Sequence, residues 1–164
     1  MNAFILWIAQ GFGAGRIPVA PGTCGSLIGL LWFFLLLQTG NFWLYLIGTV
    51  LGLALSVWLC GKAERILNQT DPGSIVLDEI AAMPLCFVVW VARAEPWPVV
   101  NSFLGPRTWL LTALVFALFR IMDIAKPWPI RRSQRLPGGW GVTIDDALAA
   151  IYVAALSLLP ALFR

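Results

Sequence analysis

The chain has 164 residues, of which 60% are hydrophobic and 12% charged, and its formal net charge is +3. A soluble domain carries about 25% charged residues, and a chain this short cannot bury so much apolar surface in a soluble core. The composition therefore predicts one membrane-embedded domain over residues 1–164. The small net charge and the scarcity of polar stretches also argue against nucleic-acid binding.

The sequence contains no histidine, which excludes a histidine nucleophile, a histidine general base and a histidine-ligated zinc site within this chain. A GxxxxGK phosphate-binding loop is also missing. Cys24, Cys60 and Cys86 lie in or beside apolar runs and are interpreted as small buried hydrophobic residues. The chemistry that remains is metal chemistry on oxygen ligands.

The chain begins with a short apolar run at residues 3–9. This run is too short to span a bilayer and predicts a short interfacial helix. The segment Gly11–Ser26 is rich in glycine and proline, which predicts an irregular loop. Its backbone amides suit the binding of an anion, although an interfacial turn explains the same residues.

Five apolar stretches account for most of the remaining chain, at about Ser26–Leu37, Phe42–Cys60, Ile80–Ala92, Trp109–Met122 and Ala147–Phe163. Only the second reaches the roughly 20 residues of a spanning helix. The last three reach it when neighbouring acids are included, so these acids are expected at, or about one turn inside, the membrane boundary. Charge there is costly and usually functional. The pattern predicts an all-α polytopic membrane bundle of about five embedded helices plus the short N-terminal interfacial helix.

Five crossings would divide the charges unequally between the two membrane faces. One face would carry eight of the eleven cations: Arg16, Lys62, Arg65, Arg120, Lys126, Arg131, Arg132 and Arg135. The other would carry Arg93, Arg107 and Arg164. The positive-inside rule makes the first face cytoplasmic. The same face would also hold seven of the eight acids, all but Glu95, and attraction to anionic lipid does not explain acids.

The acids lie at predicted helix ends. Asp78 and Glu79 are expected to open the third spanning helix, after an Asp-Pro-Gly turn, and Asp145 and Asp146 the fifth. Acids in a first turn also favour the helix dipole, so capping explains part of this pattern. Asp123 is expected to close the fourth helix, where the dipole disfavours an anion. Asp123 is therefore the strongest candidate ligand.

These five carboxylates are expected to meet at one membrane face. Hard oxygen ligands without histidine or thiolate favour Mg²⁺, and Lys126 and Arg131 lie near enough in sequence to neutralise phosphate oxygens. The predicted chemistry is metal-assisted phosphoryl transfer. One carboxylate would serve as general base or as nucleophile. A plain juxtamembrane loop would explain the basic residues alone.

Three blocks of the sequence resemble the phosphatidylglycerophosphatase A family: GFGAGRIPVAPGTCGS, DPGSIVLDEIAAM and FRIMDIAKPWPIRRSQRLPGGWGVTIDD. The resemblance implies an enzyme of the bacterial inner membrane that needs Mg²⁺ and faces the cytoplasm. Its substrate would be an anionic glycerophospholipid, phosphatidylglycerophosphate, which it would hydrolyse to phosphatidylglycerol and phosphate. The sequence departs from the family pattern at Gln134 and at residues 81–84, where Pro84 predicts a kink in the third helix.

The resemblance, together with the charge pattern, assigns candidate roles to eleven residues. The expected metal ligands are Asp78, Glu79, Asp123, Asp145 and Asp146. The expected catalytic residues are Asp123, Asp146 and Lys126. The expected substrate-binding residues are Lys126, Arg131, Arg120, Arg16, Thr23 and Ser26.

Two other functions fit parts of the pattern. A phospholipid headgroup transferase also uses clustered aspartates and Mg²⁺, but the D-x2-D-G-x2-A-R signature of the common family is missing. A non-enzymatic scaffold or cation carrier would place its acids near the bilayer midplane, whereas these acids are expected at one edge. The sequence indicates no oligomeric state.

Overall fold

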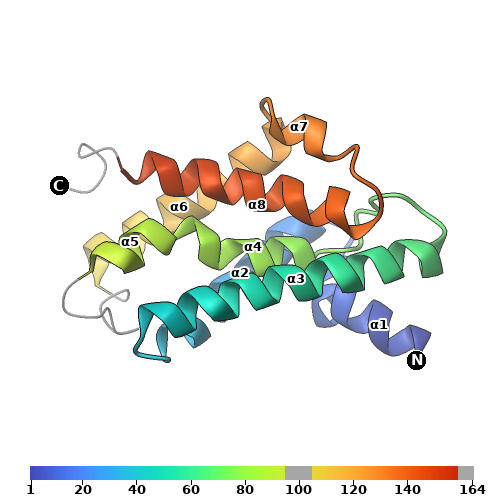
Figure 1. The fold of residues 1–164 in the computed structure, drawn as a ribbon, viewed down its shortest axis with the longest axis horizontal. Helices are drawn as coiled ribbons and strands as arrows, with labels where there is room; N and C mark the ends of the chain where they lie inside the picture. Colours follow the sequence, from blue (N-terminus) through green and yellow to red (C-terminus); the bar gives the residue numbers. More distant parts are fainter. Residues whose placement is uncertain (95–104, 159–164) are drawn as a thin grey trace.

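The structure is a computed structural model that describes residues 1–94 and 105–158. The described part is built from helices, as predicted (Figure 1). In chain order these are α1 (Asn2–Ala9), the 3-10 helix η1 (Gly11–Arg16), α2 (Pro21–Leu37), α3 (Phe42–Leu67), α4 (Leu77–Cys86), α5 (Val88–Arg93), α6 (Pro106–Ala125), α7 (Ile130–Ser133) and α8 (Gly139–Leu156). Glu95, Arg164 and the last residues of the fifth apolar stretch lie outside the described residues.

Within the described ranges, three helices are long and apolar enough to cross a membrane: Phe42–Leu67, Thr108–Ala125 and Gly139–Leu156. The first apolar stretch forms the shorter helix α2, and the third is divided into α4 and α5. The predicted all-α membrane bundle is therefore confirmed, with a count of five embedded helices as an approximation.

The third apolar stretch is broken close to Pro84, the residue that predicted a kink. The Pro84 carbonyl accepts the N–H of Phe87 at 3.0 Å and the hydroxyl of Tyr45 at 2.5 Å. The bond from Phe87 spans three residues instead of the usual four, which tightens the last turn of α4. The chain then resumes as α5 at Val88.

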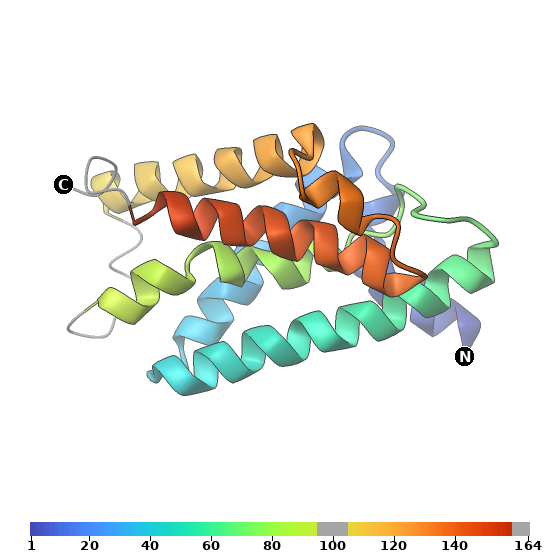
Figure 2. The ribbon, with the colours of Figure 1, turned by 45° about the horizontal axis from the view of Figure 1, so that its top comes forward.

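Helix α4 lies at the centre of the bundle. It packs against α2, α3 and α8, and α8 in turn packs against α3 and α6. Figure 1 shows α3, α4 and α8 running side by side, and Figure 2 shows α6 along the other flank of α8. The core between α2 and α4 includes Phe33 stacked on Phe87, with ring centroids 4.1 Å apart.

Small residues bring α3 and α8 close together. A Cβ atom at Gly139 would collide with the Val57 carbonyl, and one at Gly61 would lie 2.9 Å from the Gly139 nitrogen. Ser56 on α3 and Thr143 on α8 share a hydrogen bond of 3.1 Å at the same contact. The close contact at Gly61 and Gly139 sets how near α8 lies to α3.

Three boundaries differ from the sequence-based prediction. Residues 21–26 begin α2, because Pro21 occupies its first turn, where proline is tolerated; the irregular loop predicted for Gly11–Ser26 is thus wrong for these residues. Helix α3 continues past Cys60 to Leu67. Helix α8 begins at Gly139, so the prediction that Asp145 and Asp146 open it is wrong.

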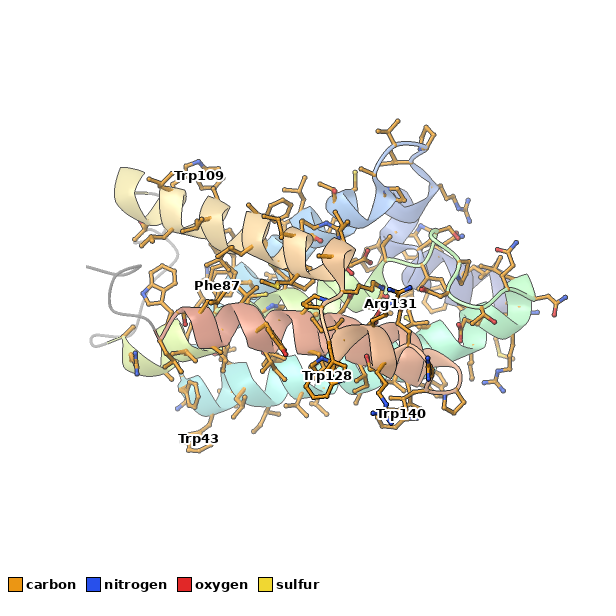
Figure 3. All side chains as sticks on the ribbon, turned by 90° about the horizontal axis from the view of Figure 1, so that it is seen from above. Trp43, Phe87, Trp109, Trp128, Arg131 and Trp140 are labelled. Carbon is orange, nitrogen blue, oxygen red and sulfur yellow. The ribbon has the colours of Figure 1, made fainter. Side chains whose placement is uncertain are left out.

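Exposed tryptophans gather at one end of the bundle. Figure 3 shows Trp43 and Trp109 at that end, whereas Trp128 lies near the middle of the long axis and Trp140 beyond it. All four side chains are exposed. Tryptophan is enriched at membrane–water interfaces, so Trp43 and Trp109 suit a helix end at such an interface.

Candidate active site

Carboxylates from three helices line one pocket of about 240 Å³. Asp78 and Glu79 occupy the first turn of α4, and Asp123 lies in the last turn of α6. Asp145 and Asp146 lie in the second turn of α8 rather than the first, because this helix starts at Gly139. The dipole at a helix start therefore does not account for Asp145 and Asp146, and the structure brings all five predicted acids together.

The innermost part of this pocket is a cluster of Asp78, Glu79 and Asp146. One carboxylate oxygen from each lies within 4.8 Å of the others, and the three residues are 6%, 9% and 3% exposed. Asp78 Oδ1, Glu79 Oε2 and Asp146 Oδ2 are buried without a hydrogen-bond partner. Buried carboxylates this close repel one another and lack solvation, so the cluster fits a bound cation.

Arg120 occupies the side of the pocket nearest α2. Its Nη1 lies 2.7 Å from Asp123 Oδ2 and 3.6 Å from Glu79 Oε1. The same nitrogen lies 3.3 Å from Ser26 Oγ. Arg120 is therefore engaged with protein carboxylates: it pairs with Asp123 on its own helix and links α6 to Glu79 on α4 and Ser26 on α2.

Lys126 closes the opposite side of the pocket. Residue 126 is the C-cap of α6 and has a φ of 43°, and its ammonium lies 2.5 Å from Asp145 Oδ2 and 4.0 Å from Asp123 Oδ1. Burial lowers the pKa of Lys126, but the hydrogen bond and the charge of Asp145 outweigh it, so the pKa is raised above its ordinary value. Lys126 is thus a fixed positive charge between α6 and α8.

A second, basic pocket adjoins the acidic one and shares Lys126 with it. Its volume is about 750 Å³, and its lining residues are Lys126, Trp128, Arg131, Arg132, Gln134 and Arg135. Figure 3 shows Arg131 beside the end of α6, with Trp128 directed away over α8. The structure therefore places Arg131 in a pocket that adjoins the acidic one through Lys126.

Two candidate substrate-binding residues lie apart from both pockets. Arg16 is exposed and donates a hydrogen bond of 2.8 Å from Nε to Gln10 Oε1. Thr23 lies in the first turns of α2. Neither residue lines the acidic or the basic pocket, whereas Ser26 reaches the acidic pocket through Arg120.

Two residues of the site were not predicted. A Cβ atom at Gly22 would collide with Glu79 Oε1 and lie 3.0 Å from Arg120 Nη2, so a larger residue there would displace both side chains. Asp71 lines the acidic pocket, and its backbone N–H donates to Glu64 Oε1 at 2.8 Å. The Asp-Pro-Gly motif indicated the turn at Asp71 but not its position beside the carboxylates.

Comparison with known proteins identifies the family. The model of the family Phosphatidylglycerophosphatase A matches residues 7–161. This chain belongs to that family. Phosphatidylglycerophosphatase A of Haemophilus influenzae is 42% identical over 88% of this chain and 81% of its own length. Phosphatidylglycerophosphatase A of Escherichia coli is 36% identical over 91% of this chain and 78% of its own length.

A third relative, from Bacteroides thetaiotaomicron, is named provisionally as a phosphatidylinositol-3-phosphatase. It is 35% identical over 88% of this chain and 86% of its own length. Comparison with solved structures gives no match. As a member of the phosphatidylglycerophosphatase A family, the protein is a phosphatase that hydrolyses a phosphomonoester. Membership favours this activity over the headgroup transferase and over the scaffold or cation carrier.

The acidic pocket holds groups whose chemistry suits the hydrolysis of a phosphomonoester. Its carboxylates provide hard oxygen ligands for a divalent cation, and Lys126 provides a positive charge beside them. Arg120 contacts the Oδ2 atom of Asp123 in the short ion pair, and the Oδ1 atom of Asp123 takes no part in that contact. The pocket therefore combines a carboxylate cluster that could hold a metal ion, a lysine ammonium and a further carboxylate at Asp123.

Proposed function

We propose that this protein is a Mg²⁺-dependent lipid phosphatase that hydrolyses phosphatidylglycerophosphate to phosphatidylglycerol and phosphate at the cytoplasmic face of a bacterial inner membrane. The observation that carries the proposal is the buried cluster of Asp78, Glu79 and Asp146. Its three unpartnered carboxylate oxygens belong to residues that line a pocket of about 240 Å³, which Lys126 also lines.

Asp78, Glu79 and Asp146 would hold the ion. Their carboxylates are the ligand type that Mg²⁺ prefers, and a dication offsets the cost of burying three like charges. When bound, Mg²⁺ would withdraw electron density from the phosphoryl group and make its phosphorus more electrophilic. Asp123 and Asp145 pair instead with Arg120 and Lys126, which favours a single ion in the inner cluster.

The side chains around this cluster suit the remaining steps of hydrolysis. Asp123 is positioned by Arg120 to accept a proton from an attacking water, or to attack phosphorus directly. Lys126 remains charged, so it would stabilise the phosphoryl oxygens and the departing glycerol oxygen electrostatically. In the overall reaction the P–O bond to glycerol breaks, water supplies the new P–O bond, and the glycerol oxygen takes up a proton.

The membrane setting supports a lipid substrate. The acidic pocket lies toward the end of the bundle at which α6 ends and α4 and α8 begin (Figure 2). The acyl chains of a lipid would remain among the apolar helices while its headgroup enters this pocket. The excess of cations that the predicted crossings assign to this face supports a cytoplasmic orientation.

The names of the relatives support a substrate class. Phosphatidylglycerophosphate and phosphatidylinositol 3-phosphate each carry a phosphomonoester on a polyol headgroup, and a phosphodiester joins that headgroup to diacylglycerol. Two of the three relatives are named for the first lipid, which favours it as the substrate here.

The proposal is tested by phosphate release from purified protein. The panel would contain phosphatidylglycerophosphate, phosphatidylinositol 3-phosphate and phosphatidic acid, each with chelator, with Mg²⁺ and with Ca²⁺. The expected result is fastest release from phosphatidylglycerophosphate, loss of activity in chelator and recovery with Mg²⁺. Turnover that persists in chelator would refute the metal dependence, and release from phosphatidic acid alone would refute the substrate.

A further inference from the structure

The basic pocket has an unusual charge balance for a surface that lies beside five carboxylates. Of its six lining residues, four are cationic and none is acidic. In the described part of the chain, no carboxylate lies within ion-pair distance of Arg131, Arg132 or Arg135. These arginines therefore present positive charge that the protein itself does not neutralise.

Helix α7 is anchored so that its arginines stay over this pocket. Ile130, its first residue, is fully buried in the main core. The Tyr152 hydroxyl on α8 donates to the Trp128 carbonyl at 3.0 Å, and Ser133 Oγ donates to the Ile130 carbonyl at 2.7 Å. Because buried and hydrogen-bonded contacts hold α7 in place, the fold itself positions the arginines of α7 at this pocket.

Lys126 lies on the boundary of the two pockets, since it lines both. Its ammonium already pairs with Asp145 on the acidic side. An anion in the basic pocket would thus be separated by the Lys126 side chain from a phosphate bound in the acidic pocket, where hydrolysis is proposed to occur. The two pockets together match a ligand with two phosphates joined by a short linker.

We propose that the basic pocket binds the phosphodiester of the lipid substrate while its phosphomonoester occupies the acidic pocket. This inference rests on the proposed function, and it adds a residue-level basis for substrate choice. In phosphatidylglycerophosphate a single glycerol separates the two phosphates, and arginine guanidinium groups form paired hydrogen bonds with phosphate oxygens. Arg131 and Arg135 therefore select lipids with a diester next to the scissile monoester, and phosphatidic acid lacks that diester.

Water-soluble headgroups separate this subsite from general attraction to the membrane. Glycerophosphoglycerophosphate carries both phosphates, whereas glycerol 3-phosphate carries only the monoester. For Arg131→Gln and Arg135→Gln, kcat/KM on the first compound is expected to fall about tenfold or more, as for loss of a charge-assisted hydrogen bond. For Arg135→Gln, kcat/KM on the second compound is expected to stay unchanged. Arg65→Gln is the matched control, because Arg65 is an exposed cation that donates to the Gly61 carbonyl and lines neither the acidic nor the basic pocket.

Other outcomes contradict the proposal. Equal losses on both headgroups would indicate a general electrostatic effect, and no loss on either would remove the subsite. A loss seen only on vesicles, and only when anionic lipid is added to phosphatidylcholine, would mean that the arginines bind bulk lipid.

A binding measurement separates this inference from the proposed function. Glycerophosphoglycerol carries the diester alone, so its binding to wild type and to Arg131→Gln can be measured by calorimetry without any turnover. Weaker binding to the variant supports the subsite even if wild type hydrolyses neither compound, a result that would defeat only the proposed function. Equal binding to both proteins overturns the subsite.

Discussion

The Lys126 ammonium lies 2.5 Å from Asp145 Oδ2, although 19 positions separate the two residues in the chain. This pair ties the end of α6 to the second turn of α8. It also forms the wall between the acidic pocket and the basic pocket. The position of Lys126 therefore affects both the proposed metal cluster and the proposed phosphate contacts.

Two substitutions at Lys126 separate the effect of its positive charge from the effect of its side-chain geometry. Lys126→Met is expected to lower kcat about 100-fold, because a fixed charge aimed at the phosphoryl oxygens is lost. Lys126→Arg is expected to retain part of the activity, since the charge remains but the guanidinium differs in geometry. Steady-state phosphate release measures both variants. Equal activity of Lys126→Met and wild type would remove this residue from the site.

The Lys126–Asp145 pair also predicts a pH dependence on the alkaline side. The folded-state pKa of Lys126 lies above its ordinary value of 10.5, so its stabilising contribution is complete below 10.5 and is lost as pH rises through the folded-state value. The difference in thermal midpoint between wild type and Lys126→Met should therefore be constant from neutral pH to about pH 9. A difference that vanishes within this range would contradict the raised pKa.

Asp123→Asn is expected to abolish phosphate release while leaving the protein folded in the membrane. The amide keeps the side-chain shape but cannot accept a proton or attack phosphorus. It also weakens the pairing with Arg120, which lies 2.7 Å away. Phosphate release and circular dichroism in detergent check both parts, with Glu64→Gln as a carboxylate-to-amide control outside the acidic pocket. Near-normal turnover in Asp123→Asn would count against the site.

Gly22→Ala tests whether the close approach of α2 to the site matters. The added methyl group would collide with Glu79 Oε1 and crowd Arg120, so both side chains must shift. A displacement of about 1 Å in a catalytic group reduces activity about 100-fold. Leu27→Ala on the same helix, where the side chain is 52% exposed, is the control. If both variants retain full activity, the geometry around Glu79 tolerates displacement.

Tyr45→Phe is expected to affect stability rather than chemistry. The Tyr45 hydroxyl donates to the Pro84 carbonyl at the break between α4 and α5, and both residues are buried. Losing a buried hydrogen bond costs about 1 kcal/mol, which would lower the thermal midpoint. The KM for the lipid should not change, because neither Tyr45 nor Pro84 lines the acidic or the basic pocket. A changed KM with an unchanged midpoint would contradict this assignment.

Several features of the fold and site follow from local sequence. The apolar stretches predicted the helices, Pro84 predicted the break, and Asp78 and Glu79 lie at the helix start that the turn signal indicated. The convergence of five acids also followed, because each acid lies near the end of an apolar stretch. These features depend on residues close together in the chain.

Other features depend on contacts between helices and could not be read locally. The sequence predicted that Asp145 and Asp146 open the last helix, but α8 begins at Gly139, where its glycine-containing first turns pack closely against α3. The role of Gly22 depends on how closely α4 and α6 approach α2. Arg120 was predicted to bind phosphate, yet it pairs with Asp123 three residues along α6 and, through the tertiary fold, with Glu79 on α4.

The most direct test of the central claim is divalent-ion binding to the inner carboxylate cluster, measured with Mn²⁺ by electron paramagnetic resonance and displaced by Mg²⁺. Wild type and Glu64→Gln are expected to bind the ion, and Asp146→Asn is expected to lose both ion binding and phosphate release. If Asp146→Asn binds Mn²⁺ as tightly as wild type does, the cluster of Asp78, Glu79 and Asp146 is not the metal site.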